Sequence, residues 1–211
     1  MSAGSPAGSF AGEGEADAVA RSMSPEACFS SAARTSRTKV VQSMPMATRS
    51  AGLLMYRRTH GSLEVLLVHP GGPFWARKDE GAWSIPKGEY DCAMEEALAA
   101  AKREFTEETG FPPGAMHRSL GDTRMRSGKL VAAWAFEGDC DPGALVSNTF
   151  ELEWPPHSGR RASFPEADRA EWFTAEEACR RLHPAQRVFI ERLDHLIAQD
   201  APSTPGTHSL R

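Results

Sequence analysis

The sequence predicts a single domain with a mixed α+β sandwich fold. Short apolar segments of strand character surround one early helix and two late helices, without the regular strand and helix alternation of a doubly wound sheet. The 211 residues suffice for one domain with a substantial core and are too few for two large domains. We therefore expect one folded body flanked by tails.

The elements follow from apolar patterning and from turn residues. Two strands are expected at residues 51–56 and 63–69, because short apolar runs flank a turn that contains Gly61. A helix is expected from Glu95 to Thr109, a segment rich in Ala, Glu and Leu that lacks Pro and stops at Gly110. Further strands are expected at residues 118–126, 130–137, 147–154 and 169–173, and helices at residues 175–182 and 184–197.

The ends of the chain differ in composition from its middle. Residues 1–46 are dominated by Ser, Ala and Gly, with Phe10 and Phe29 as their aromatic residues, so they bury too little apolar surface to offset the entropy of ordering. We expect a disordered extension at residues 1–46, a folded domain at 47–197 and a flexible tail at 198–211. The sequence leaves open whether translation starts at Met1, Met44 or Met46.

Charge and cysteine usage exclude several classes of function. A net charge of −4 gives no global attraction to nucleic-acid polymers or anionic membranes. A phosphate-bearing substrate therefore requires a local source of positive charge, such as a metal ion. No stretch approaches the roughly 18 to 20 apolar residues of a membrane span. The four scattered cysteines lack zinc-ligand spacing, which favours free thiols in a cytoplasmic protein.

The acidic end of the first expected helix carries the candidate chemistry. Glu104, Glu107 and Glu108 share one helix face, because positions i, i+3 and i+4 are neighbours. Carboxylates so close repel one another and raise one another's pKa, so a cation is needed among them. Oxygen ligands of this kind suit Mg²⁺, with Mn²⁺ able to substitute. The alternative is a solvated helix whose acids pair with Arg103 and Lys102.

Neighbouring residues complete the predicted site. Lys87, beside the flexible backbone of Gly88, is expected to contact phosphate. Arg103 lies one turn before Glu107, where its guanidinium can hydrogen-bond a carboxylate and fix its orientation. The small side chains of Ala97, Ala100 and Ala101 are expected to leave room for a metal and a phosphate chain. The stripe expected to dock the helix on the sheet is formed by Met94, Leu98, Ala101 and Phe105.

Gly88, Glu95 and the segment from Arg103 to Phe111 together resemble the Nudix box, G-x5-E-x7-R-E-U-x-E-E-x-G-U. One departure is that six residues, where the pattern has five, separate Gly88 from Glu95, so this loop carries one extra residue. The resemblance implies a Nudix-type α/β/α sandwich with a mixed sheet. It also implies metal ligands at Glu104, Glu107 and Glu108, with Arg103 and Glu95 as an orienting pair.

The resemblance implies attack by water on a phosphoanhydride bond of a nucleoside diphosphate derivative, a small-molecule nucleotide. Residues 83–88 resemble both the dinucleoside polyphosphate hydrolases and bacterial proteins described as predicted NTP pyrophosphohydrolases, and residues 147–156 resemble the latter. We expect diadenosine tetraphosphate as substrate, with two alternatives: a pyrophosphohydrolase of free or oxidised nucleoside triphosphates, or a catalytically silent nucleotide-binding module. The oligomeric state is open, and so is the general base among Glu104, Glu153, Glu166 and Glu171. Structural roles are expected for His69, Trp83 and Trp154.

Overall fold

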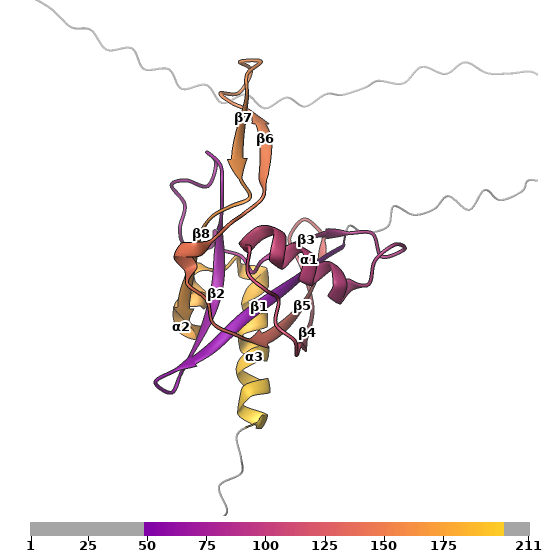
Figure 1. Cartoon of the computed structure of the whole chain (residues 1–211), viewed down its shortest axis with the longest axis vertical. Helices are drawn as coiled ribbons and strands as arrows, with labels where there is room; N and C mark the ends of the chain where they lie inside the picture. Colours follow the sequence, from indigo (N-terminus) through magenta and orange to yellow (C-terminus); the bar gives the residue numbers. More distant parts are fainter. Residues whose placement is uncertain (1–48, 201–211) are drawn as a thin grey trace, which may run out of the picture. The chain divides into compact units, whose positions relative to one another are not determined.

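A computed structural model of the chain describes residues 49–200 (Figure 1). The extension predicted at residues 1–46 and most of the predicted tail lie outside these residues. Within residues 49–200, no helix is long and apolar enough to cross a membrane. Cys92, Cys140 and Cys179 are free thiols, as expected, and Cys28 lies outside the described part of the chain.

A mixed six-stranded sheet forms the centre of the domain, in the order β4-β5-β1-β2-β8, with β3 also paired to β1. The central strand β1 pairs in parallel with β5 and antiparallel with β2 and β3. The strands of this sheet are β1 (Arg49–Thr59), β2 (Ser62–Pro70), β3 (Lys87–Tyr90), β4 (Arg118–Arg124), β5 (Leu130–Glu137) and β8 (Ala167–Thr174).

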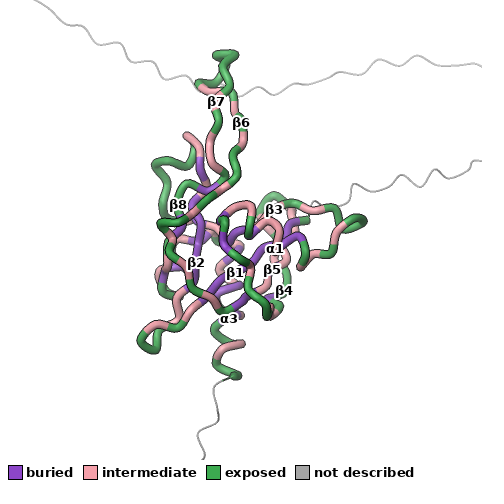
Figure 2. The backbone as a smooth tube through the Cα atoms, viewed as in Figure 1, coloured by how far each residue is buried: buried purple, intermediate pink, exposed green. Residues whose placement is uncertain are grey.

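Helices cover both faces of the sheet, which confirms the predicted α/β/α sandwich (Figure 1). Alternate residues of β1 serve the two layers: Leu53 packs with Phe105 of α1 (Ala97–Thr109), and Leu54 packs with Phe189 of α3 (Arg187–Asp200). The helix α2 (Ala175–Arg181) lies on the same side as α3. Because β1 is covered on both faces, its sequence is a continuous apolar run, and Figure 2 shows the buried residues concentrated there.

The helix α1 begins at Ala97, two residues later than expected, and ends at Gly110. Gly110 adopts the left-handed conformation (φ 73°), and its N–H donates to the carbonyl oxygen of Thr106. Two packing predictions were wrong. Met94 precedes the helix in a turn and is 84% exposed, so it does not dock the helix. Ala100 and Ala101 are fully buried against the sheet, so they leave no room for a substrate.

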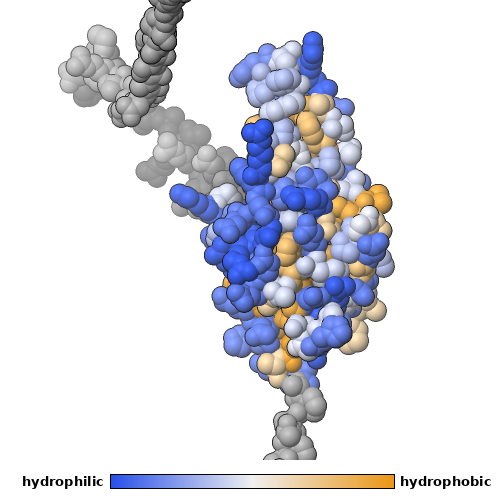
Figure 3. Space-filling model, turned by 90° about the vertical axis from the view of Figure 1, so that its left-hand side faces the viewer, coloured by the Kyte–Doolittle hydropathy of each residue, from blue (hydrophilic) through white to orange (hydrophobic). Residues whose placement is uncertain are grey.

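A separate two-stranded hairpin, β6 (Thr149–Glu153) and β7 (Arg161–Pro165), extends away from the main sheet (Figure 1). Trp154, expected in the core, lies instead on this hairpin, where its ring packs edge-on against Phe74 at 5.5 Å. Phe74, from the connection between β2 and β3, is itself 57% exposed. Figure 3 shows that the hairpin and the body below it carry apolar residues scattered among hydrophilic ones.

Two short 3-10 helices, η1 (Pro142–Ala144) and η2 (Pro184–Gln186), complete the fold. The first precedes the hairpin, and the second leads into α3. Together they place the connecting segments beside β8 and beside the loop that enters β3. Those two regions form the surroundings of the candidate site.

Candidate active site

The strand β3 lies directly against the acidic face of α1. The backbone N–H of Lys87 donates to Oε2 of Glu108 at 3.0 Å, which ties the strand to the helix. At Gly88 a Cβ atom would lie 1.8 Å from Oε2 of Glu104. Only glycine permits this approach of strand backbone to carboxylate. The predicted phosphate-binding residues Lys87 and Gly88 therefore lie beside two of the three predicted metal ligands.

Arg103 connects three carboxylates of the site. Its Nη1 donates to Glu104 at 2.7 Å and to Glu107 at 3.1 Å, while its Nε and Nη2 form a bidentate pair with Glu95. The hydrogen bonds from Arg103 lower the pKa of Glu95, and the carboxylates raise the pKa of Arg103. The extra residue after Gly88 does not prevent Glu95 from reaching Arg103. A charge-assisted network of this kind fixes the orientation of its members.

Burial and like charge act together at the inner end of the site. Burial raises the pKa of Glu108 to about 7, with Glu104 and Glu166 adding to the rise and the charge of Lys87 opposing it. Burial also lowers the pKa of Lys87, against the attraction of Glu108. Both shifts express the cost of holding a charge away from water. A cation at this point would offset that cost for the carboxylates.

Glu166, between β7 and β8, is a further carboxylate near the cluster, and it comes from a segment far from α1 in the chain. Burial raises its pKa, and the charges of Glu104 and Glu107 raise it further. Its backbone N–H donates to the carbonyl oxygen of Asn148 at 2.8 Å, and its own carbonyl oxygen accepts from Gly71 at 2.9 Å. A small cavity of about 70 Å³ is lined by Val68, Pro70, Ser84, Lys87, Glu108 and Glu166.

The other two acids considered as bases outside the helix lie elsewhere. Oε1 of Glu153 accepts from the backbone N–H of Gly159 at 2.8 Å, inside the hairpin. Glu171 lines a different and larger cavity, which lies between β8 and residues 142–147. The structure thus separates three acids that looked equivalent in the sequence, and it brings Glu166 alone among them to the helix carboxylates.

Among residues 49–200, no three carboxylate, imidazole or thiol groups surround one point closely enough to form a metal site as they stand. The reason is that Arg103 bridges Glu104 and Glu107, while the amide of Lys87 binds Glu108. The side chains of Arg103 and Glu107 are 39% and 40% exposed, so they have room to turn. The donor set consists of carboxylate oxygens, which fits Mg²⁺.

Gln186 supports the site, and this role could not be predicted from the sequence. Its side chain is 1% exposed; its Oε1 accepts from the backbone N–H of Ile85 at 2.9 Å, and its Nε2 donates to Oγ of Ser84 at 3.0 Å. These bonds hold the segment that leads into Lys87. The role depends on a contact between residues about a hundred positions apart, which no local pattern reveals.

His69 and Trp83 are structural, as expected. His69 is fully buried; its Nδ1 lies 2.7 Å from Asp168, and its Nε2 lies 2.8 Å from the carbonyl oxygen of Lys78. Trp83 is fully buried as well, and its indole N–H donates to Asp79 at 2.7 Å. Packing and internal hydrogen bonds occupy both rings. The reactive groups of this region are therefore the acid cluster and Lys87.

Comparison with known proteins identifies the family. The model of the NUDIX domain matches residues 46–193, and the chain belongs to the Nudix family and is a Nudix hydrolase. A binary complex of a C. elegans Ap4A hydrolase superposes with a TM-score of 0.50 at 21% identity, over 72% of this chain and 99% of that one.

A second solved structure is similar in fold. The NUDIX domain of Shewanella oneidensis NrtR, complexed with ADP ribose, superposes with a TM-score of 0.51 at 15% identity, over 73% of this chain and 90% of that one. A search of curated protein sequences found no significant match. At such low identity these likenesses establish the fold, and the substrate has to be argued from the site.

Proposed function

We propose that this Nudix hydrolase is Mg²⁺-dependent and cleaves dinucleoside polyphosphates such as diadenosine tetraphosphate. The observation that carries the proposal is the convergence of four carboxylates, three on α1 and one at Glu166, beside Lys87. A phosphate chain carries several negative charges and meets such a cluster only with a divalent cation between them. Lys87 adds a positive charge at the edge of the same cavity.

Each residue then has a role in the reaction. Glu104, Glu107 and Glu108 would hold the cation, and Arg103 with Glu95 would keep these carboxylates oriented. When bound, Mg²⁺ neutralises the phosphate charge and lowers the pKa of a coordinated water. Lys87 and the backbone at Gly88 position the phosphate chain. Glu166 accepts the proton of the attacking water, since it faces the cluster from outside the helix.

The proposed substrate class follows from binding energy. A dinucleoside polyphosphate offers contacts at both ends, and a distant nucleoside can help to orient the scissile phosphate. The C. elegans protein of the same fold is described as an Ap4A hydrolase, which is consistent with this choice.

We expect diadenosine tetraphosphate to be cut asymmetrically into ATP and AMP, with a higher kcat/KM than dATP, GTP or ADP-ribose. Incubation with Mg²⁺ followed by chromatography measures both the products and the rates. Equal efficiency on all four compounds would contradict the substrate assignment. A preference for an oxidised purine triphosphate would favour a nucleoside triphosphate pyrophosphohydrolase. Binding without turnover of any compound would indicate a silent module.

Glu107→Gln and Glu108→Gln are expected to lower kcat by at least about 10²-fold, the scale of losing one electrostatic contributor. Both changes preserve shape and remove a negative charge, so the melting temperature should change little. Glu96→Gln is the matched control, because Glu96 stands at the start of the same helix without a side-chain capping bond. Normal turnover of the Glu108→Gln enzyme would show that Glu108 does not hold the cation.

A further inference from the structure

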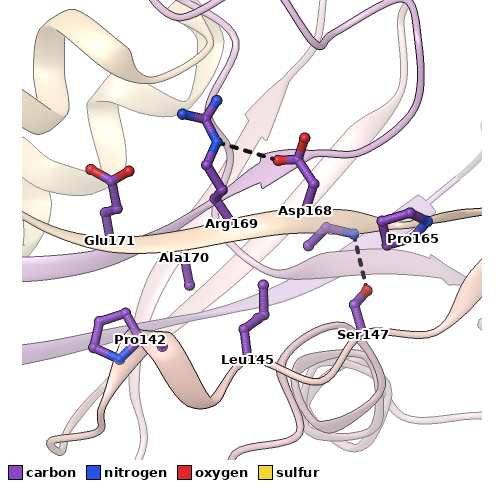
Figure 4. Close-up of a pocket in the computed structure, with 10 residues that line it drawn as sticks. Pro142, Leu145, Ser147, Pro165, Asp168, Arg169, Ala170 and Glu171 are labelled. Carbon is purple, nitrogen blue, oxygen red and sulfur yellow. Dashed lines mark hydrogen bonds and ion pairs between the residues drawn. The ribbon is translucent and has the colours of Figure 1, made fainter.

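A cavity of about 440 Å³ lies between β8 and the segment that runs from η1 to β6 (Figure 4). It is separate from the small cavity at Lys87 and Glu108, and the two cavities share no lining residue. Sites for small molecules commonly measure about 300 to 1,000 Å³. This cavity is therefore large enough for a nucleoside and too large to be a packing defect.

Both walls of the cavity continue into the acid cluster. Pro165 and Ala167 line it, and Glu166, which faces the helix carboxylates, stands between them in the chain. On the opposite wall, Oγ of Ser147 accepts from the backbone N–H of Ala167 at 3.0 Å. The next residue, Asn148, donates its backbone N–H to the carbonyl oxygen of Glu107 at 3.0 Å. A molecule whose phosphates lie at the cluster can therefore extend into this cavity.

The lining suits an uncharged ring system better than phosphate. Pro142, Leu145 and Ala170 supply apolar surface, and Figure 4 shows Leu145 reaching toward β8. The cation of the lining, Arg169, is paired with Asp168 at 3.6 Å. Glu171 adds a further negative charge on the rim, which repels phosphate.

The polar groups of the rim match a nucleoside. The carboxylate of Glu171 can accept hydrogen bonds from ribose hydroxyls or from an exocyclic amino group. Arg169 is about half exposed; one face of its guanidinium lies over the Trp83 ring at 5.3 Å, and the face turned away from Trp83 can stack on a base. An apolar floor with a few polar groups at the rim is the usual composition of such sites.

We propose that this cavity binds one of the two nucleosides of the substrate. The other nucleoside, at the opposite end of the polyphosphate chain, is held elsewhere. The inference rests on the proposed function, because it assumes a substrate with two nucleosides. It assigns the preference for dinucleoside compounds to the surface formed by β8 and the segment 142–147, outside the Nudix box.

The test compares diadenosine tetraphosphate with adenosine tetraphosphate, which has the same phosphate chain and lacks one nucleoside. The wild-type enzyme is expected to favour the dinucleoside compound in kcat/KM by at least about tenfold, and Leu145→Trp, which fills the cavity, should reduce this preference to about one. Ala144→Trp is the matched control, because Ala144 is the exposed neighbour of Leu145 and does not line the cavity. It should keep the preference of the wild type.

A second variant separates an occupied cavity from a disturbed fold. Glu171→Trp places the same bulk at an exposed rim position of a strand, where an aromatic residue is well tolerated. It should lower the preference as well, while the melting temperature stays that of the wild type. A preference that survives both Leu145→Trp and Glu171→Trp would overturn the inference.

Binding measurements make the inference independent of turnover. Calorimetric titration with a methylene-bridged analogue of diadenosine tetraphosphate should give a Kd that rises in Leu145→Trp and not in Ala144→Trp. If the wild type binds this analogue in that manner but hydrolyses nothing, the proposed function fails and the cavity assignment stands. If hydrolysis is normal and both variants match the wild type, the cavity assignment alone fails.

Discussion

Removal of divalent cations is expected to abolish hydrolysis, and added Mg²⁺ or Mn²⁺ should restore it. Four carboxylates face one another at the site, and mutual repulsion contributes to the raised pKa of Glu108 and of Glu166. A phosphate chain added to this cluster without a divalent cation would meet further repulsion from the four carboxylates, which the single charge of Lys87 does not offset. Exhaustive treatment with EDTA, followed by chromatography of the products of diadenosine tetraphosphate, measures the effect.

The control for this experiment is the melting temperature, which reports whether the fold is intact after chelation. The core clusters do not include the acids of the site, so the melting temperature should change little on chelation. Restoration by Mg²⁺ or Mn²⁺ shows that the loss comes from the missing cation. Full activity after chelation would refute the proposed mechanism, because no other group in the described site supplies equivalent charge.

The strands that the sequence predicted correctly are those that carry a continuous apolar signal. The strand β1 contains Leu53, Leu54 and Met55 in succession, because helices cover both of its faces. The strand β3 was missed, since its sequence from Lys87 to Tyr90 is polar and it is held by backbone pairing with β1. The strand β7 was missed because its five residues contain no apolar run, and among the described residues it pairs with β6 alone.

The site divides in a similar way. The acids of α1 follow from helix periodicity, so their shared face could be predicted from Glu104, Glu107 and Glu108 alone. The extra residue before Glu95 is accommodated in a turn, in which the carbonyl oxygen of Asp91 accepts from the N–H groups of both Met94 and Glu95. The spacing of residues along α1 is therefore enough to predict most of the part of the site that the helix contributes.

The choice among acids outside the helix could not be made from the sequence. Glu166 reaches the cluster because the hairpin returns the chain to Asn148, whose carbonyl oxygen binds the N–H of Glu166. Glu171, farther along β8, lines the separate cavity beside residues 142–147. These positions depend on pairing between segments far apart in the chain, and no periodicity encodes them.

Glu166→Gln is expected to lower kcat by about 10³-fold, within the range of a general base, while KM and the Mg²⁺ concentration for half-maximal activity stay near those of the wild type. The amide keeps the shape of the side chain and cannot accept the proton of the attacking water. Glu153→Gln is the matched control, because Glu153 binds only within the hairpin, and it should retain full activity. If excess Mg²⁺ restored the Glu166→Gln enzyme, Glu166 would be a metal ligand and the base would have to be sought among the helix acids.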